Sequence, residues 1–145
     1  MRISIFGSGY VGLVQAAVFA DVGHRVICVD IDAERVERLI RGEVPFFEPG
    51  LSEMVIRGVE SGLLTFTTNT KTAVESSEFL FICVGTPPMA DDSPDLQYIM
   101  SVADGIAEHI NGRKVVINKS TVPVGTADAV TARITKGMAQ YGRDH

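Results

Sequence analysis

The stretch Ile3-Ser4-Ile5-Phe6-Gly7-Ser8-Gly9-Tyr10-Val11-Gly12 decides how this chain folds. An apolar run ends at Gly7, a glycine loop follows, and a helical pattern begins near Val11. The spacing of Gly7, Gly9 and Gly12 matches the dinucleotide-binding fingerprint, in which they permit a tight turn, close approach of a diphosphate, and close helix–strand packing. The amide groups of the first helical turn would face the phosphates, with the positive end of the helix dipole behind them.

The surroundings of the glycine loop strengthen this interpretation, because a glycine motif alone is weak evidence. Asp30 ends the next apolar run, about 20 residues after the glycines, where an acceptor for ribose hydroxyls is expected. A carboxylate there also repels a 2′-phosphate, so the sequence predicts NAD rather than NADP. Arg35 follows in the next helical pattern; it lies either at the adenosine end of the cofactor or on the solvated surface.

Composition and charge limit the possible classes of protein. The chain has 145 residues, the size of one domain, with 46% hydrophobic and 21% charged residues. Its net charge of −5 argues against a nucleic-acid or anionic-membrane partner. No apolar run approaches the ~20 residues needed to span a bilayer, and the chain opens directly on a strand, so we expect no signal peptide and a cytoplasmic location.

The cysteines and histidines predict no chemistry of their own. Cys28 and Cys83 fall inside predicted buried strands, which favours reduced core thiols over a disulfide or a nucleophile. The three histidines lie far apart in the sequence, so no metal site is expected.

Apolar patterning predicts alternating strands and helices along the whole chain. Strands are predicted over residues 3–6, 25–29, 63–68, 78–84 and 114–118, and helices over 11–22, 32–41, 51–61, 70–76, 94–110 and from 126 onward. The strand at 63–68 reads as an edge strand, the one at 78–84 as a central strand, and the one at 114–118 as another buried strand. Ser93 is expected to cap the fifth helix, with Pro94 at its first position, and Thr126 to cap the sixth.

This alternation predicts an α/β fold, a Rossmann-type doubly wound and mostly parallel sheet with helices on both faces. In such sheets the ligand lies outside the carboxyl ends of the strands. Three loops should meet there: the glycine loop, residues 85–87 and residues 120–124. Their small and hydroxylated residues suit a diphosphate, a ribose and a nicotinamide.

Four collinear motifs resemble the UDP-glucose/GDP-mannose dehydrogenase family, and the branch of UDP-glucose 6-dehydrogenases most of all. They are Gly7-x-Gly9-Tyr10-Val11-Gly12-Leu13, Glu48-Pro49-Gly50-Leu51, Val84-Gly85-Thr86-Pro87 and Lys119-Ser120-Thr121-Val122-Pro123-Val124-Gly125-Thr126. The resemblance covers nearly the whole chain. It implies an enzyme of nucleotide-sugar metabolism and polysaccharide biosynthesis that oxidises the C6 alcohol of UDP-glucose to a carboxylate in two NAD-linked steps, through a thiol-bound intermediate.

The resemblance also assigns roles to single residues. It implies that Tyr10 and Val11 contact the pyrophosphate, and that Asp30 and Arg35 contact the adenosine ribose. The same resemblance places three residues along the rest of the cofactor cleft: Thr86, Ser120 and Thr121, of which Thr121 lies near the nicotinamide and helps to place water for the hydrolytic step. For Glu48 it implies no more than loop ordering near the cofactor.

Members of this family continue into further segments that carry the catalytic cysteine and the substrate contacts. The resemblance therefore implies that residues 1–145 are the NAD-binding domain of a larger enzyme, inactive alone. Apolar surface on the last helix predicts that this domain can self-associate. Two alternatives share the fold: a free-standing NAD(H)-sensing regulatory module and a dehydrogenase of the hydroxyacid type. Neither has an evident reason to carry the motifs at 48–51 and 119–126.

Overall fold

A computed structural model describes residues 1–143 as strands and helices that alternate along the chain. In chain order these are β1 (Arg2–Phe6), α1 (Tyr10–Asp21), β2 (Arg25–Val29), α2 (Ala33–Ile40), α3 (Leu51–Glu60), β3 (Leu64–Thr67), α4 (Thr70–Ser76), β4 (Phe79–Ile82), α5 (Gln97–His109), β5 (Val115–Asn118) and α6 (Thr126–Gln140). Every predicted element is present, with bounds shifted by a few residues. Among the described residues no helix has both the length and the apolar character needed to cross a bilayer.

The five strands form one parallel sheet in the order β3-β2-β1-β4-β5, which confirms the predicted doubly wound α/β fold. The N-terminal strand β1 is central, and its last residue, Phe6, is in register with Val29 on β2 and Ile82 on β4. The strand order reverses direction at this point. The glycine loop therefore leaves the sheet at the topological switch point, where open α/β sheets bind their ligands.

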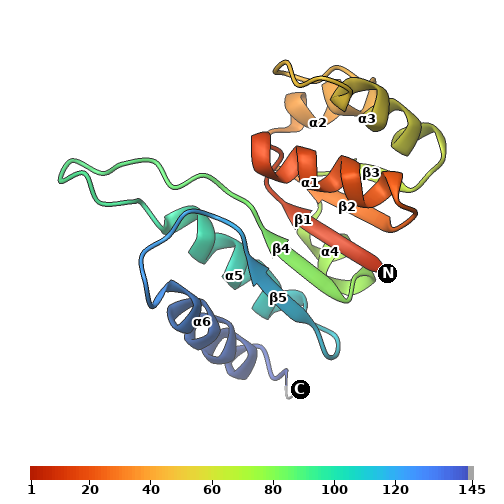
Figure 1. Ribbon diagram of the computed structural model, residues 1–145. Coiled ribbons are helices and arrows are strands. Elements are labelled where there is room, and N and C mark those ends of the chain that lie inside the picture. Colours follow the sequence, from red (N-terminus) through yellow and green to blue (C-terminus); the bar gives the residue numbers. More distant parts are fainter. Residues whose placement is uncertain (144–145) are drawn as a thin grey trace.

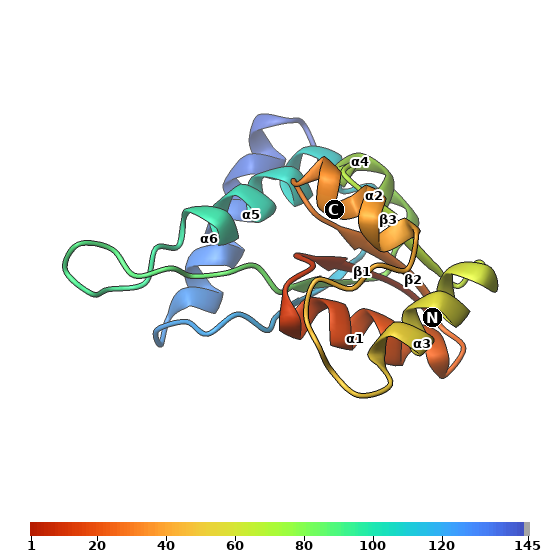
Figure 2. The same cartoon turned by 90° about the horizontal axis from the view of Figure 1, so that it is seen from above.

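Helices cover both faces of the sheet, as Figures 1 and 2 show. Helices α1 and α3 pack together on one face, while α4 and α5 lie on the other and α6 packs against α5. Each face encloses an apolar cluster. Leu13 and Val55 belong to the first and Ile99 and Ile106 to the second, and all four side chains are fully buried.

The start of α5 differs from the prediction. The helix begins at Gln97, and Ser93 and Pro94 precede it in a loop. Pro94 forms an isolated bridge with Pro88, so this part of the chain folds back on itself and forms an arm between β4 and α5 that reaches away from the rest of the domain (Figure 1). Instead of Ser93, the Asp95 carboxylate accepts a hydrogen bond from the Gln97 amide, at 2.9 Å.

The last strand and helix also differ in detail. Thr126 is the first residue of α6, and the cap position belongs to Gly125, whose φ of +91° favours glycine. The Thr126 hydroxyl donates to the Pro123 carbonyl instead, at 2.8 Å. Strand β5 is a second edge strand of the described sheet rather than a buried one, since Val115 is 47% exposed.

Candidate functional site

Gly7 makes the turn that takes the chain out of the sheet. Its φ is +107°, a backbone conformation that residues with a side chain rarely adopt, and its amide donates to the Val29 carbonyl at 2.8 Å. A Cβ atom at this position would lie 2.6 Å from the Cys83 carbonyl oxygen. Both observations confirm the predicted tight turn, which no residue with a side chain could make without displacing the backbone after β4.

Gly12 allows the first turn of α1 to approach this loop. A Cβ atom at Gly12 would lie only 1.9 Å from the Gly7 carbonyl oxygen. The helix and the loop are therefore in backbone contact, which confirms the predicted close packing. This contact brings the N-terminus of α1 to the carboxyl edge of the sheet.

The N-terminus of α1 faces open space. The first helical hydrogen bond runs from the Leu13 amide to the Gly9 carbonyl at 2.9 Å, so the amides of Tyr10, Val11 and Gly12 precede it. Gly9 is the cap residue, and a Cβ atom built on it meets no described atom within 4 Å. The first turn of α1 contains no acidic residue. Free amides, the positive end of the helix dipole and room in front of them suit an anion such as a diphosphate.

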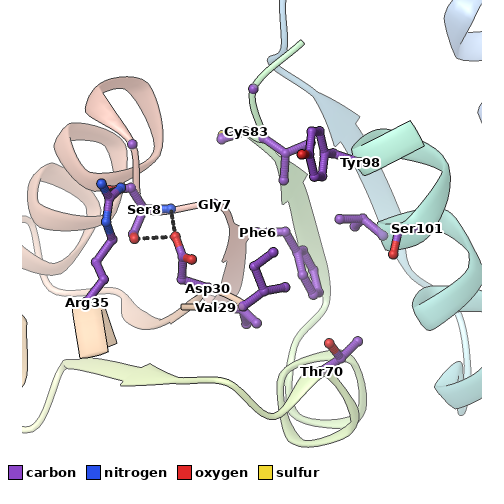
Figure 3. A pocket seen from close by; sticks show the side chains of 15 residues that line it. Phe6, Gly7, Ser8, Val29, Asp30, Arg35, Thr70, Cys83, Tyr98 and Ser101 are labelled. Carbon is purple, nitrogen blue, oxygen red and sulfur yellow. Dashed lines mark hydrogen bonds between the residues drawn. The ribbon is translucent and has the colours of Figure 1, made fainter. Parts of the chain in front are cut away.

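Asp30 directly follows β2 and is hydrogen-bonded to the glycine loop. Its Oδ2 accepts hydrogen bonds from the Ser8 amide at 3.0 Å and from the Ser8 hydroxyl at 2.5 Å, as Figure 3 shows. Its Oδ1 accepts a hydrogen bond from the Asp32 amide at 3.0 Å. Arg35, in the first turn of α2, donates from Nη1 to the Ser8 carbonyl at 3.4 Å. The predicted ribose acceptor and the arginine thus lie on the same side of the glycine loop.

A cavity of about 330 Å³ opens in front of these groups. Four predicted residues line it: Gly7, Gly9, Asp30 and Arg35. The opposite wall comes from helices α4 and α5, which contribute Thr70, Tyr98 and Ser101 (Figure 3). The sequence analysis missed these three because they belong to no motif. The only available signal was the i, i+3 spacing of Tyr98 and Ser101, which puts two hydroxyl-bearing side chains on one face of the predicted helix.

The two loops after β4 and β5 lie side by side at the same edge of the sheet. The Thr86 hydroxyl donates to the Thr121 carbonyl at 3.0 Å, and the Ser120 hydroxyl donates to the Val84 carbonyl at 2.8 Å. These hydroxyls therefore join one loop to the other. Gly85 lines the cavity together with the glycine loop, whereas Thr86, Ser120 and Thr121 adjoin the cavity without lining it.

The loop at residues 43–50 contacts the outer side of α1. The Tyr10 hydroxyl donates to Glu48 Oε2 at 2.9 Å, and the ring centroids of Tyr10 and Phe46 lie 5.4 Å apart. This hydrogen bond to a carboxylate raises the pKa of Tyr10. Glu48 thus orders its loop against the first residue of α1, beside the open end of that helix.

Neither cysteine has the setting of a nucleophile. Cys28 is fully buried in β2, and burial raises the pKa of its thiol above the ordinary value. Contrary to the prediction, Cys83 does not lie inside a strand. It follows Ile82, where the chain leaves the sheet beside Gly7, and it lines the cavity. Burial raises the pKa of Cys83 to about 11, so its thiol stays protonated at neutral pH. The part of the chain that the structure describes contains no cluster of three side chains suited to a metal ion.

Known proteins with a similar sequence and structure point the same way. Residues 1–144 match the profile of the UDP-glucose/GDP-mannose dehydrogenase family, NAD binding domain. The chain is 43% identical over 142 residues to UDP-glucose 6-dehydrogenase TuaD of Bacillus subtilis and 50% identical over 131 residues to UDP-glucose 6-dehydrogenase of Rhizobium meliloti. These alignments cover 98% and 90% of this chain and 30% of each relative, so the chain spans less than a third of their length.

A solved structure of a related protein has the same fold. The GDP-mannose dehydrogenase of Pseudomonas aeruginosa superposes with a TM-score of 0.92 at 40% identity, covering 96% of this chain and 33% of that one. That structure is of a ternary complex.

Proposed function

Because the chain belongs to the UDP-glucose/GDP-mannose dehydrogenase family, we propose that it is the cofactor-binding part of a nucleotide-sugar 6-dehydrogenase that oxidises the C6 alcohol of UDP-glucose. The cofactor of the family's domain is NAD, which supplies the hydride acceptor when bound. One observation carries the proposal: Gly9, the cap residue at the open N-terminus of α1, and Asp30 line the same cavity. These are the two groups that a diphosphate and an adenosine ribose require.

Different residues of the site bind different parts of the cofactor. We assign the diphosphate to the amides of Tyr10, Val11 and Gly12, for which Gly9 leaves room. Asp30 and Arg35 hold the adenosine ribose at the other side of the loop.

The joined loops after β4 and β5 are assigned to the nicotinamide half of the cofactor. Ser120 and Thr86 hold the two loops in place through their hydrogen bonds. Thr121, which is exposed at this edge of the sheet, helps to place water in the hydrolytic step.

The alternative of a free-standing NAD(H)-sensing module is not favoured, because the matching relatives are dehydrogenases. Cytoplasmic location and the lack of nucleic-acid or membrane partners stay predictions that rest on charge and composition. Self-association stays a prediction that rests on apolar surface of the last helix.

A titration and a turnover assay test the proposal together. The 145-residue protein should bind NADH, seen as a change in nicotinamide fluorescence or as heat in calorimetry. It should form no NADH from NAD and UDP-glucose, because its two thiols are buried and protonated. Absence of NADH binding would contradict the cofactor assignment. Turnover of UDP-glucose would contradict the assignment of the chemistry to residues outside this chain.

A further inference from the structure

Ser8 is the residue of the glycine loop to which the fingerprint gives no task, yet its side chain is almost fully buried, at 1% exposure. Both its amide and its hydroxyl donate to the same oxygen, Oδ2 of Asp30 (Figure 3). The Ser8 amide therefore points to Asp30 and away from the phosphate positions, which are left to the first turn of α1. A buried serine with two hydrogen bonds to one carboxylate oxygen holds that carboxylate in a single orientation.

The hydrogen bonds of the Asp30 carboxylate limit what it can still accept. A carboxylate offers about four acceptor positions on its two oxygens. Ser8 fills both positions of Oδ2, and the Asp32 amide fills one on Oδ1. One acceptor position remains, on Oδ1. The adenosine ribose of NAD presents two neighbouring hydroxyls, so the carboxylate can accept only one of them.

The second hydroxyl has a partner on the other side of the loop. Arg35 lines the same cavity, and its guanidinium is placed by its hydrogen bond to the Ser8 carbonyl. A guanidinium donates and never accepts, so it complements the carboxylate. Ser8 thus contacts both ribose-binding side chains, one through its donors and the other through its carbonyl.

From this geometry, and resting on the proposed function of NAD binding, we infer that Ser8 is a positioning residue for cofactor selection. It holds the Asp30 carboxylate where one oxygen accepts a single ribose hydroxyl and where the negative charge excludes a 2′-phosphate. NADH gains from this fixed carboxylate, because its ribose donates to it. NADPH does not, because its phosphate replaces the donor and meets the charge.

The test compares NADH and NADPH binding to the wild-type chain with binding to Ser8→Ala and Ser8→Gly. Both variants remove the hydroxyl and keep the amide. They should weaken NADH binding about tenfold, the size of one hydrogen bond to a charged group, and leave NADPH binding nearly unchanged. The ratio of the two dissociation constants, NADPH over NADH, should therefore fall about tenfold in each variant. Two variants guard against a folding defect in one of them, and thermal unfolding checks both.

Ser4→Ala is the matched control. Ser4 is also a fully buried serine, and its hydroxyl bonds to the Ala73 carbonyl and the Ser77 hydroxyl, away from the cavity. This variant should lower the melting temperature and leave the ratio unchanged. Equal weakening of both cofactors by Ser8→Ala, or an unchanged ratio in both Ser8 variants, would overturn the inference while leaving NAD binding itself intact. A wild-type chain that binds no NADH would overturn the proposed function as well.

Discussion

Gly9 should be the residue whose substitution abolishes cofactor binding while sparing the fold. Its φ of −71° and ψ of −168° are accessible to any residue, and a Cβ atom there meets nothing within 4 Å. The stability cost of Gly9→Val is therefore limited to the loss of a favourable cap residue, about 1 kcal/mol. For a domain of this size that corresponds to a fall in melting temperature of roughly 4 °C.

The effect of Gly9→Val on binding should be much larger. The branched side chain would occupy the space in front of the amides of Tyr10, Val11 and Gly12, where we place the diphosphate. Each hydrogen bond to a charged group is worth about 1.5–3 kcal/mol, so loss of two of these amide–phosphate bonds lowers the binding free energy by at least about 3 kcal/mol. The dissociation constant for NADH should rise by more than about 100-fold.

Gly12→Ala supplies the contrast, because its Cβ atom would lie 1.9 Å from the Gly7 carbonyl oxygen. Backbone must move to relieve that overlap, which typically costs about 1–3 kcal/mol or more. The assay pairs NADH titration by calorimetry with thermal unfolding of each protein. If Gly9→Val still binds NADH within threefold of the wild type, the diphosphate does not approach this loop. If Gly9→Val unfolds as readily as Gly12→Ala, the space in front of Gly9 is not open as described.

Three further outcomes follow from contacts described in this structure. Asp104 and Arg133 form a two-point ion pair between α5 and α6, which lowers the pKa of Asp104, so Asp104→Asn should reduce stability slightly at pH 7. Urea unfolding at a series of pH values should show the difference in stability between variant and wild type vanish as the pH falls through that lowered pKa. Cys28 and Cys83 should react with iodoacetamide at pH 7.5 far more slowly in the native protein than in urea, as counted by mass spectrometry; fast native alkylation of either thiol would contradict its burial. Thr86→Val removes the hydrogen bond that joins the two loops after β4 and β5, so NADH binding should weaken a few-fold with little change in melting temperature. An unchanged affinity for NADH would contradict the assignment of these loops to the cofactor.

Much of the fold was predictable because its signals are local. Apolar runs such as residues 25–29 give strands, and the positions of Gly7 and Gly12 dictate a turn and a close contact that the structure shows. The start of α5 was not predictable in the same way. Ser93-Pro94 is a favourable helix start, yet the bridge between Pro88 and Pro94 keeps this stretch extended, and that contact depends on how the whole arm folds back.

The candidate site was predictable only where a motif or a resemblance named its residues. Asp30 was found from its distance to the glycines, but the hydrogen bonds that hold it come from Ser8, a position the motif leaves free. The α5 wall of the cavity, with Tyr98, depends on the packing of a helix about 90 residues along the chain from the glycine loop. The spacing of Tyr98 and Ser101 marks one face of that helix, but nothing in the sequence says that this face packs opposite the glycine loop.

The place of β1 at the centre of the sheet has a consequence for the order in which the domain can assemble during translation. Within this domain β1 is synthesised before the other four described strands and can pair early with β2, within a unit that runs from β1 to β3. Its other edge stays open until β4 at Phe79–Ile82 has been synthesised. An unpaired strand edge is a template for pairing with other chains. Nascent chains that stop at residue 70 should therefore be trapped by a holdase chaperone more strongly than chains that include β4, a difference that ribosome-bound truncations would measure. Equal trapping of both would mean that the half-built sheet protects this edge in some other way.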